Sequence, residues 1–268
     1  MEVRIDLRKT VPENARLLYE KSKKAKEKIP GIEHSIGETR RRLDGLRERI
    51  EQEQVRRQER RQPPEKRKWF EKFRWFTSSD GFLVVGGRDA TSNEVLVKKH
   101  TEVHDTIFHA DIQGAPFFVV KNPEGKPLPD ATVREASEAA ASYSSGWKAG
   151  VGAVDVYYVS PEQVSKTPES GEYLAKGAFV VRGKRDWARK VALKLAVGVE
   201  RAGGRVVGGP ASCIEKSCDV FAVIVPGYEK QGETAAHVKK LLEARFAGGV
   251  FLADVQKFIP GGRSKVIK

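Results

Sequence analysis

The sequence predicts an α+β protein, with a mixed, largely antiparallel sheet and helices, preceded by a long helical coiled-coil arm. From Trp69 onward, apolar runs of strand length outnumber helical stretches, and most connections between them are short. Before Trp69 the chain is rich in Lys, Arg, Glu and Gln, and its apolar residues recur at helical spacing. We therefore expect an arm over residues 1–64, an α+β domain over 68–186 and a basic α+β extension over 187–268.

The arm carries its apolar residues in a heptad pattern, which places them in one stripe along a helix. One core position holds Ala15, Ser22, Ile29, Ile36, Leu43 and Ile50, and the other holds Leu18, Ala25, Ile32, Thr39 and Leu46. Such a stripe needs a cover, either a second helix or the chain's own globular body. Pro30-Gly31 interrupts the segment without shifting the register, which predicts a kink or a break between two helices. Pro63-Pro64 then ends the helix.

The rest of the chain alternates short apolar runs with turns. Strands are expected at 82–85, 106–110, 117–123, 154–159, 178–183 and 221–227, with a hairpin of 195–200 and 205–209 around Gly203-Gly204. A helix is expected from Asp130 or Thr132 to Gly150, and residues 186–194 favour helix or loop. A last helix over 233–246 should turn inward Ala236, Val238, Leu241 and Leu242.

Charge points to polyanionic partners. The chain has 49 Lys+Arg and 36 Asp+Glu, a net charge of +13, and its pI is near 9.7. The charge is +8 over residues 1–70, −4 over 71–180 and +9 over 181–268, so the two flanks are the expected contacts with nucleic acid. The alternative is a basic surface that only keeps the protein in solution.

Targeting signals and cysteines bound the compartment. No run of 18 apolar residues exists, and the charged N-terminus lacks the apolar core of a signal peptide. Cys213 and Cys218 are too few for a disulfide scaffold, and no His pair flanks them at zinc-site spacing. We expect a cytoplasmic protein that does not enter membranes.

Three groups of residues are candidates for chemistry. Arg88-Asp89 follows Gly86-Gly87, which could form a backbone anion nest, although no nucleotide-binding motif is present. His104, His109 and Asp111 have a spacing compatible with a metal site or, more simply, with structural histidines. The third group is basic and fits phosphate contacts without base readout: Lys166, Lys176, Arg182, Lys184 and Arg185. Trp147, Tyr143 and Tyr173 could stack on bases or belong to the core.

Four segments, in order, resemble the NFACT-R domain of the NFACT proteins of ribosome-associated quality control. They read WFEKFRWFTSSDGFLVVGGRDATSNE, HADIQGA, YSSGWKAG and QVSKTPESGEYLAKGAFVVRGKR, and the likeness covers residues 68–186. Archaeal and bacterial members of this family are often labelled fibronectin-binding proteins. The arm resembles the returning helix of the family's coiled-coil hairpin, and residues 190–268 resemble the C-terminal extension of archaeal members.

The resemblance implies a function that composition does not give. Family members bind a large ribosomal subunit obstructed by peptidyl-tRNA, hold tRNA there and, in many cases, promote tailing of the nascent chain without mRNA. The ribosome makes the peptide bonds, so the resemblance implies a rescue factor for stalled ribosomes that is no enzyme and needs no cofactor. Its partners would be tRNA and the rRNA of the large subunit. The second His of the family's HADLHG motif is Gln113 here, which weakens any role of that His.

Two sets of residues are expected to form the site. Those expected to contact RNA are Arg88, Lys121, Lys166, Lys176, Arg182, Lys184 and Arg185. Those expected to belong to the motif or to its structure are Asp80, Gly81, Gly86, Gly87, Asp89, Asn93, His109, Asp111, Gly114, Gly171, Glu172 and Tyr173. No catalytic residue and no metal ligand is assigned.

Three functional questions stay open at this point. The family's NFACT-N domain and outgoing coil are not in this sequence, so we expect the arm to pair with a separately encoded N-terminal half, or the sequence to be part of a longer protein. A second possibility is a stand-alone module that presents tRNA to a modification enzyme. A third is a metal-dependent nuclease built on His104, His109 and Asp111.

Overall fold

A computed structural model describes residues 5–59, 68–167, 174–201, 203–246 and 248–267, with side chains up to residue 47 in the first of these ranges. The described residues divide into two units, the arm and residues 68–268. Among the helices of these residues, none combines the length and apolar character that a membrane span requires.

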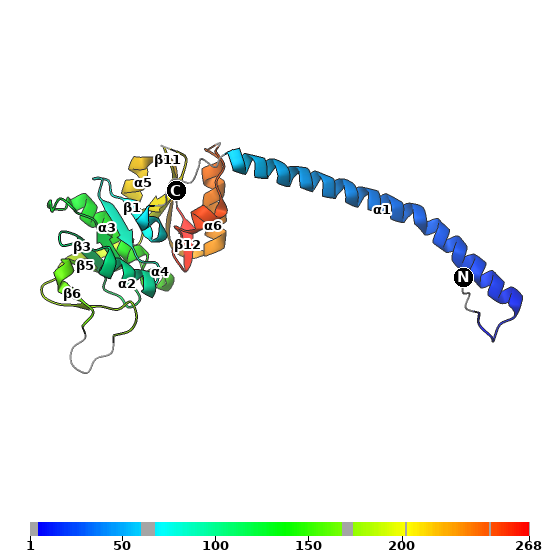
Figure 1. Ribbon diagram of the computed structural model, residues 1–268, viewed down its shortest axis with the longest axis horizontal. Helices are drawn as coiled ribbons and strands as arrows, with labels where there is room; N and C mark the ends of the chain where they lie inside the picture. Colours follow the sequence, from blue (N-terminus) through cyan, green and yellow to red (C-terminus); the bar gives the residue numbers. More distant parts are fainter. Residues whose placement is uncertain (1–4, 60–67, 168–173, 202, 247, 268) are drawn as a thin grey trace. The chain divides into compact units, whose positions relative to one another are not determined.

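The arm is a single long helix, α1 (Val11–Glu59), as the heptad pattern predicts (Figure 1). Thr10 and Glu13 cap its start, because the Thr10 backbone N–H and hydroxyl both donate to Glu13 Oε2 at 2.8 Å. These hydrogen bonds lower the pKa of Glu13. The helix continues through Pro30, so the alternative of two separate helices is wrong. It is curved along its length in Figure 1, and the predicted stop at Pro63-Pro64 lies outside the described residues.

An antiparallel sheet forms the first layer of residues 68–268. Its described strands lie in the order β1 (Arg74–Thr77), β2 (Leu83–Gly86), β4 (Phe117–Val120), β3 (Thr106–Ala110), β5 (Ala153–Val159) and β8 (Asp186–Ala192). Side chains alternate between its two faces. Val84, Phe108 and Phe118 pack on one face under α3 (Asp130–Ser142), while Val85 and Ile107 pack on the other under α2 (Ala90–Lys99). Burial of both faces explains the nearly continuous apolar runs in the sequence.

A second antiparallel sheet follows, in the order β10 (Val206–Gly209), β9 (Leu195–Glu200), β11 (Cys218–Lys230) and β12 (Arg263–Val266). It is accompanied by α5 (Ala211–Ser217), α6 (Gln231–Glu243) and α7 (Leu252–Gln256). Its apolar residues join the α3 side of the first sheet in one core. Trp147 Nε1–H donates to Ser264 Oγ at 3.0 Å and Tyr143 O–H to the Phe258 carbonyl at 3.0 Å, which tie the two sheets together. These two aromatic rings are therefore used in the structure's interior.

The α+β class with largely antiparallel sheets is confirmed, and several local predictions are corrected. Residues 186–194 contain strand β8, neither helix nor loop, so the first sheet extends past the expected domain limit at residue 186. The division of 68–268 into two domains stays a prediction. Helix α2 went unpredicted, and the expected helix to Gly150 divides into α3 and α4 (Ser145–Ala149). In α6, Ala236 and Leu241 are exposed, and Thr234 and Ala235 are buried in their place.

Short elements complete the first sheet's surroundings. A 3-10 turn, η1 (Trp69–Lys72), precedes β1, and a second, η2 (Pro161–Gln163), precedes the two-residue strand β6 (Val164–Ser165). Strand β6 pairs with β7 (Val180–Val181), so the expected strand over 178–183 is short and lies outside the main sheet. This small β6–β7 ribbon leads directly into β8 and carries the basic group picked out in the sequence.

Candidate nucleic-acid interface

The HADIQG loop leaves strand β3 in a rigidly held conformation. The Asp111 N–H donates to the Asp155 carbonyl on β5 at 2.8 Å, and the Ser145 hydroxyl donates to the Gln113 carbonyl at 2.6 Å. Gly114 adopts φ +81°, a left-handed conformation that favours glycine. The loop is therefore fixed from the sheet on one side and from α4 on the other.

His109 is a partly buried, neutral residue that supports this loop. Its Nε2 lies 3.1 Å from the Ala115 carbonyl, which can only accept, so Nε2 carries the proton. Burial lowers the pKa of His109 to about 4, against smaller raising effects from backbone groups and Asp111. The ring packs between Phe117 and Tyr157, with centroid distances of 4.4 and 5.5 Å. His109 thus supports the sheet surface and is uncharged near pH 7.

The alternative of a metal site is not supported by this geometry. His104 precedes β3 and lies against Gly125, whereas His109 and Asp111 lie at the other end of the strand. Five residues of strand separate the ends by roughly 17 Å, at about 3.4 Å per residue. Across the described part of the chain, no group of three or more His, Cys, Asp or Glu side chains is placed to hold a metal ion.

A depression of about 280 Å³ opens beside this loop. It is lined by His109, Ala110, Asp111, Ile112, Gln113, Tyr157 and Arg185. The Arg185 guanidinium lies over the Tyr157 ring at 4.6 Å, a cation–π contact that holds it at the rim. The HADIQG motif and the end of the basic segment, far apart in sequence, therefore meet at one place.

Strand β8 extends this surface along the edge of the sheet. Trp187 pairs with Tyr157 across β5 and β8, with ring centroids 5.6 Å apart. The Arg189 guanidinium lies 3.8 Å over the Trp187 ring and donates to Asp155 at 2.7 Å. Sequence reasoning missed Trp187 and Arg189 because it did not assign a strand there. Their spacing of two residues is the signal that a strand would place both on one face.

The β6–β7 ribbon presents further cations. Gln163 Nε2 donates to the carbonyls of Arg182 and Lys184, at 2.8 and 2.7 Å, which fixes the backbone between them. The side chains of Lys176, Arg182 and Lys184 are exposed, and no carboxylate among the described residues forms an ion pair with them or with Arg185. Arg182, Lys184, Arg185 and Arg189, together with Tyr157 and Trp187, are called the β8-edge surface below, whereas Lys176 lies near Asp89 at the start of α2.

Three of the predicted RNA contacts are engaged within the fold. Lys166 Nζ donates to the carbonyls of Ala175 and Ala178 and pairs with Glu94 at 3.7 Å. Lys121 Nζ lies 2.5 Å from Asp105 Oδ2, and the Lys121 side chain is 13% exposed. Arg88 donates from its guanidinium to the Phe73 carbonyl at 3.0 Å. We therefore leave these three out of the proposed contact surface.

The glycine-rich motif, Gly86-Gly87-Arg88-Asp89, has a structural role. The N–H groups of Arg88 and Asp89 both donate to the Ser92 hydroxyl, and Gly87 N–H donates to the Phe117 carbonyl, so these amides do not form a free anion nest. Asp89 instead caps α2, where it accepts from the Ser92 N–H at 2.7 Å. These hydrogen bonds lower the pKa of Asp89, and the one from the Ser92 N–H has the largest effect.

The remaining motif residues fix the backbone around this cap. A Cβ on Gly87 would overlap Asn93 Oδ1, which accepts from the Phe117 N–H at 3.2 Å, and a Cβ on Gly86 would overlap the Phe118 ring. Asp80 accepts from the Thr132 hydroxyl at 2.8 Å, next to Gly81 with φ +91°. Three other predicted residues lie outside the described part of the chain: Gly171, Glu172 and Tyr173.

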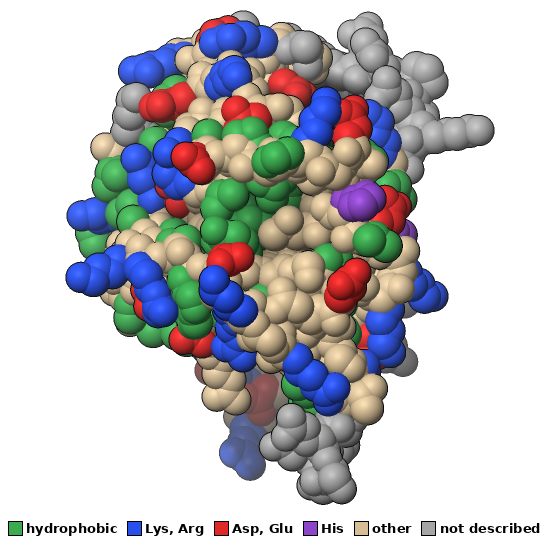
Figure 2. Space-filling model, turned by 90° about the vertical axis from the view of Figure 1, so that its left-hand side faces the viewer, with side chains coloured by type: hydrophobic (Ala, Val, Ile, Leu, Met, Phe, Trp, Pro, Cys, Tyr) green, Lys and Arg blue, Asp and Glu red, His purple; other side chains and the backbone are tan. Residues whose placement is uncertain are grey.

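Charge on the surface is local. In Figure 2, which faces the side where β6 lies in Figure 1, Lys and Arg side chains are interspersed with Asp and Glu around an apolar area. A surface of this kind does not attract a polyanion uniformly. Binding of nucleic acid would depend on groups of cations such as the β8-edge surface.

The partly buried His109 gives a testable pH dependence. Because its folded pKa, about 4, lies below the ordinary value of 6.5, the unfolded chain binds the proton more tightly. The stabilisation is complete above pH 6.5 and is lost as the pH falls toward 4. We expect the free energy of unfolding of the wild type to fall between pH 7 and 5 by about 2 kcal/mol more than that of His109→Gln. Urea titrations at both pH values measure this, and equal losses in the two proteins would contradict it.

Comparison with known proteins finds a matching family and several similar proteins. Residues 72–183 match the family described as NFACT protein RNA binding domain. The archaeal Rqc2 homologue aRqcH of Methanocaldococcus jannaschii is 40% identical over 195 residues, which are 72% of this chain and 28% of that protein. The ribosome quality control complex subunit NEMF of Homo sapiens is 43% identical over 119 residues, 44% of this chain and 11% of that protein.

An insect protein and a solved structure are also similar to the chain. The ribosome quality control complex subunit NEMF homologue of Drosophila melanogaster is 45% identical over 119 residues, 44% of this chain and 12% of that protein. The C-terminal part of the fibronectin/fibrinogen-binding protein from Streptococcus suis has a TM-score of 0.39 and 22% identity, covering 49% of this chain and 50% of that chain. The chain spans less than a third of the length of the three curated relatives named here.

Proposed function

Because the chain is an NFACT-R family protein of the archaeal type, we propose that it is a ribosome-associated quality control factor. In this proposal it binds tRNA and the large ribosomal subunit obstructed by peptidyl-tRNA, and so takes part in the rescue of stalled nascent chains. It would act in the cytoplasm, where ribosomes translate. The NEMF relatives carry ribosome quality control in their names, and the family match over residues 72–183 reaches the β6–β7 ribbon next to the β8-edge surface.

The β8-edge surface is the observation that supports RNA binding most directly. Arg182, Lys184 and Arg185 have no ion-pair partner among the described residues, so no carboxylate neutralises their charges. Arg182 and Arg185 each also donate to one backbone carbonyl, of Thr167 at 3.3 Å and of Val181 at 3.5 Å. Next to them, Arg189 is already stacked on Trp187 and Arg185 on Tyr157. Guanidinium planes fixed on aromatic rings can stack on unpaired bases, while the ammonium groups contact the backbone. The basic extension after β8 would add phosphate contacts to rRNA.

In this proposal the protein is a binding factor and not a catalyst. Peptide-bond formation would stay with the ribosome, and the protein would hold its partners in place. The candidate residues fit that division, because His109 is neutral, partly buried and hydrogen-bonded to the Ala115 carbonyl. The nuclease alternative required three ligands at one place, and the described residues do not bring them together. No cofactor is required for binding of this kind.

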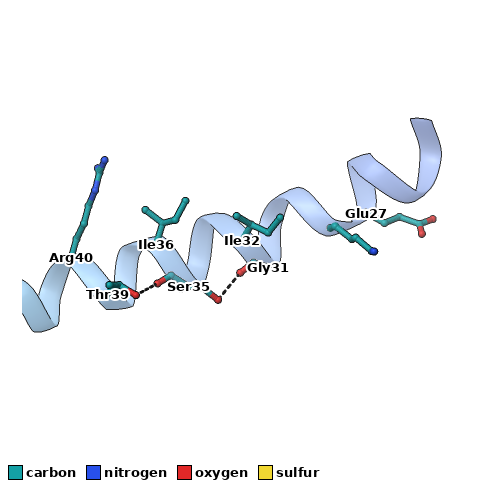
Figure 3. Close-up of a pocket in the computed structure, with 8 residues that line it drawn as sticks. Glu27, Gly31, Ile32, Ser35, Ile36, Thr39 and Arg40 are labelled. Atoms are coloured by element: carbon teal, nitrogen blue, oxygen red, sulfur yellow. Dashed lines mark hydrogen bonds between the residues drawn. The ribbon is translucent and has the colours of Figure 1, made fainter. Parts of the chain in front are cut away.

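The arm supplies a second proposed contact. Ile29, Ile32, Ile36, Leu43 and Leu46 are each about half exposed on α1. Figure 3 shows Ile32 and Ile36 on one side of the helix, and both line a shallow groove of about 650 Å³ that extends from Glu27 to Arg40. The Ser35 and Thr39 hydroxyls donate back to the carbonyls of Gly31 and Ser35. A helix that covers the stripe therefore does not have to supply hydrogen-bond acceptors for these two donors. We propose that a coil helix of an N-terminal NFACT half, separately encoded or in the same protein, covers it.

Two substitutions on the stripe test the pairing. Ile32→Asp with Ile36→Asp puts two charges in the proposed seam, so co-purification of a coil-bearing NFACT-N protein from the native cell should be lost. His34→Asp with Arg41→Asp, about 160° away on a helix of 3.6 residues per turn, is the matched control and should retain the partner. Absence of any coil-bearing partner with the wild type, together with a native protein that has no coil helix of its own before the arm, would contradict the pairing.

In an alternative function, the RNA-bound protein would deliver tRNA to a modification enzyme and not act on the ribosome. A stand-alone module that presents tRNA to a modification enzyme would use the same cationic surface. It gives no reason for an exposed apolar stripe on a helix of 49 residues. The arm therefore favours the ribosomal function.

Sedimentation with ribosomal particles separates the two functions. We expect the protein to co-sediment with large subunits that carry peptidyl-tRNA more strongly than with empty large subunits, because tRNA and rRNA then both supply contacts. Equal and negligible pelleting with both particles, together with retained binding to free tRNA, would favour the modification module instead.

A further inference from the structure

The depression beside the HADIQG loop contains an acid and a base that do not pair with each other. Asp111 and Arg185 both line it, yet no ion pair joins them, and no described residue forms an ion pair with either. Both charges act on Tyr157: burial raises its pKa most, Arg185 lowers it, and Asp111 raises it by a smaller effect. A carboxylate at this position disfavours a phosphate in the depression itself. The site is suited to a neutral group that donates hydrogen bonds.

The other residues that line the depression restrict the kinds of ligand that can bind there. The Arg185 guanidinium lies on the Tyr157 ring at 4.6 Å, donates to the Val181 carbonyl at 3.5 Å and lines the depression, where a fixed planar cation can stack on a flat ligand. The Gln113 side chain, whose backbone carbonyl is held by Ser145, brings an amide that can donate and accept. The volume of about 280 Å³ lies near the lower end of the range of roughly 300–1,000 Å³ for small-molecule sites. A single nucleobase is a ligand of this size and shape.

Guanine fits the donor and acceptor groups best. Its Watson–Crick edge carries two adjacent donors, N1–H and the N2 amine, and a carboxylate has two oxygens that only accept. Adenine, cytosine and uracil each lack that pair of neighbouring donors. We propose that the depression takes one unstacked guanine base, with Asp111 accepting from N1–H and N2–H and Arg185 stacking on the ring. Exposed Lys184 and Arg182 would hold the adjoining phosphates.

This inference rests on the proposed RNA binding and adds base preference to it. Surfaces that contact only phosphates do not distinguish sequences, whereas a base held on its Watson–Crick edge is read. The loop is pre-organised for base binding, because hydrogen bonds with Asp155 of β5 and Ser145 of α4 hold it in place without a ligand.

Pentanucleotides test the preference on the full chain. UUGUU, UUAUU, UUCUU and UUUUU, with inosine in the central position as a fifth probe, compete against a labelled RNA. We expect UUGUU to bind about tenfold more tightly than the A, C and U forms. Inosine lacks the N2 amine and should fall between. Equal affinities for all five would overturn the base site while leaving RNA binding intact, and failure of every pentanucleotide and of tRNA to bind would instead overturn the proposed function.

Asp111→Asn assigns the preference to the carboxylate. The variant keeps the shape of the side chain and the backbone hydrogen bond to Asp155, so it should fold, as urea titration can verify. We expect the guanine-to-adenine ratio to fall to about twofold or less. Glu162→Gln removes one exposed charge beside the same ribbon but outside the depression, and its ratio should stay that of the wild type. An unchanged ratio in Asp111→Asn would exclude this residue as the reader.

Discussion

Removal of three cations from the β8-edge surface should weaken tRNA binding by roughly 10- to 100-fold at low salt. The substitutions are Arg182→Gln, Lys184→Gln and Arg185→Gln, and each removes a charge without an ion-pair partner among the described residues. Because these side chains are at the surface, the free energy of unfolding should change by no more than about 1 kcal/mol, mainly from the lost Arg185–Tyr157 contact. Fluorescence anisotropy with labelled tRNA and urea titration measure the two effects.

A charge-matched control belongs beside this variant. Lys98→Gln, Lys99→Gln and Lys126→Gln remove three exposed cations from α2 and from the turn after β4, away from the β8-edge surface. We expect at most a severalfold loss of affinity from the lower net charge. If both triple variants lose affinity equally, net charge rather than this surface holds the RNA. Lys166 is left out of the variant because its ammonium is bound by the carbonyls of Ala175 and Ala178 and by Glu94.

Lys121 should affect folding and not RNA binding. Its ammonium contacts Asp105, whose side chain is fully buried and also accepts from the N–H groups of Glu102 and Asn122 at 2.7 and 2.9 Å. Lys121→Ala leaves this carboxylate without its counter-charge, so we expect a loss of about 3–5 kcal/mol in the free energy of unfolding. Affinity for tRNA, measured where the variant is still folded, should match the wild type within a few-fold.

Lys126→Ala is the control for this prediction. Lys126 lies five residues away and is exposed, so its loss should cost about 1 kcal/mol or less. The contrary result would be a Lys121→Ala protein of normal stability with reduced tRNA affinity. That outcome would return Lys121 to the RNA contacts expected from the sequence.

Sequence patterns predicted the elements whose side chains face a core on both sides. Strands β2, β3, β4 and β5 are apolar runs because α2 and α3 cover the two faces of the sheet. The turn glycines and the αL residue Gly150 at the end of α4 were also predictable, since few other residues adopt those conformations. These features depend on local chemistry that a sequence displays.

The elements that sequence reasoning missed lie where polar residues mix with few buried ones. Strand β8 is an edge strand with exposed Arg189 and Lys190, and the β5–β8 register shifts at Val154/Val156, which conceals its alternation. Helix α2 buries only Asn93 and Leu96 and contains several β-branched residues, so its pattern is weak despite the Asp89–Ser92 capping box. Neither signal is strong in the sequence alone.

The candidate site was predictable in composition more than in geometry. Counting charges selected Lys121, Lys166 and Arg185 alike, because the sequence does not say which cation meets a carboxylate or a carbonyl in the fold. The structure assigns Lys121 and Lys166 to internal contacts and leaves Arg185 at the depression. It also adds Trp187 and Arg189, which come to the surface only once β8 is a strand.

The salt dependence of tRNA binding tests the central claim most directly, that fixed cations at the β8 edge hold RNA phosphates. Titration of labelled tRNA with the wild type and with the Arg182, Lys184 and Arg185 variant between 50 and 200 mM salt gives the slope of log affinity against log salt. We expect a steep negative slope for the wild type, and a slope shallower by about 1.4–1.8 for the variant, since the phosphate contacts of Arg182 and Lys184 each contribute about 0.7–0.9. No binding by the wild type at 50 mM salt, or identical slopes for the two proteins, would contradict the claim.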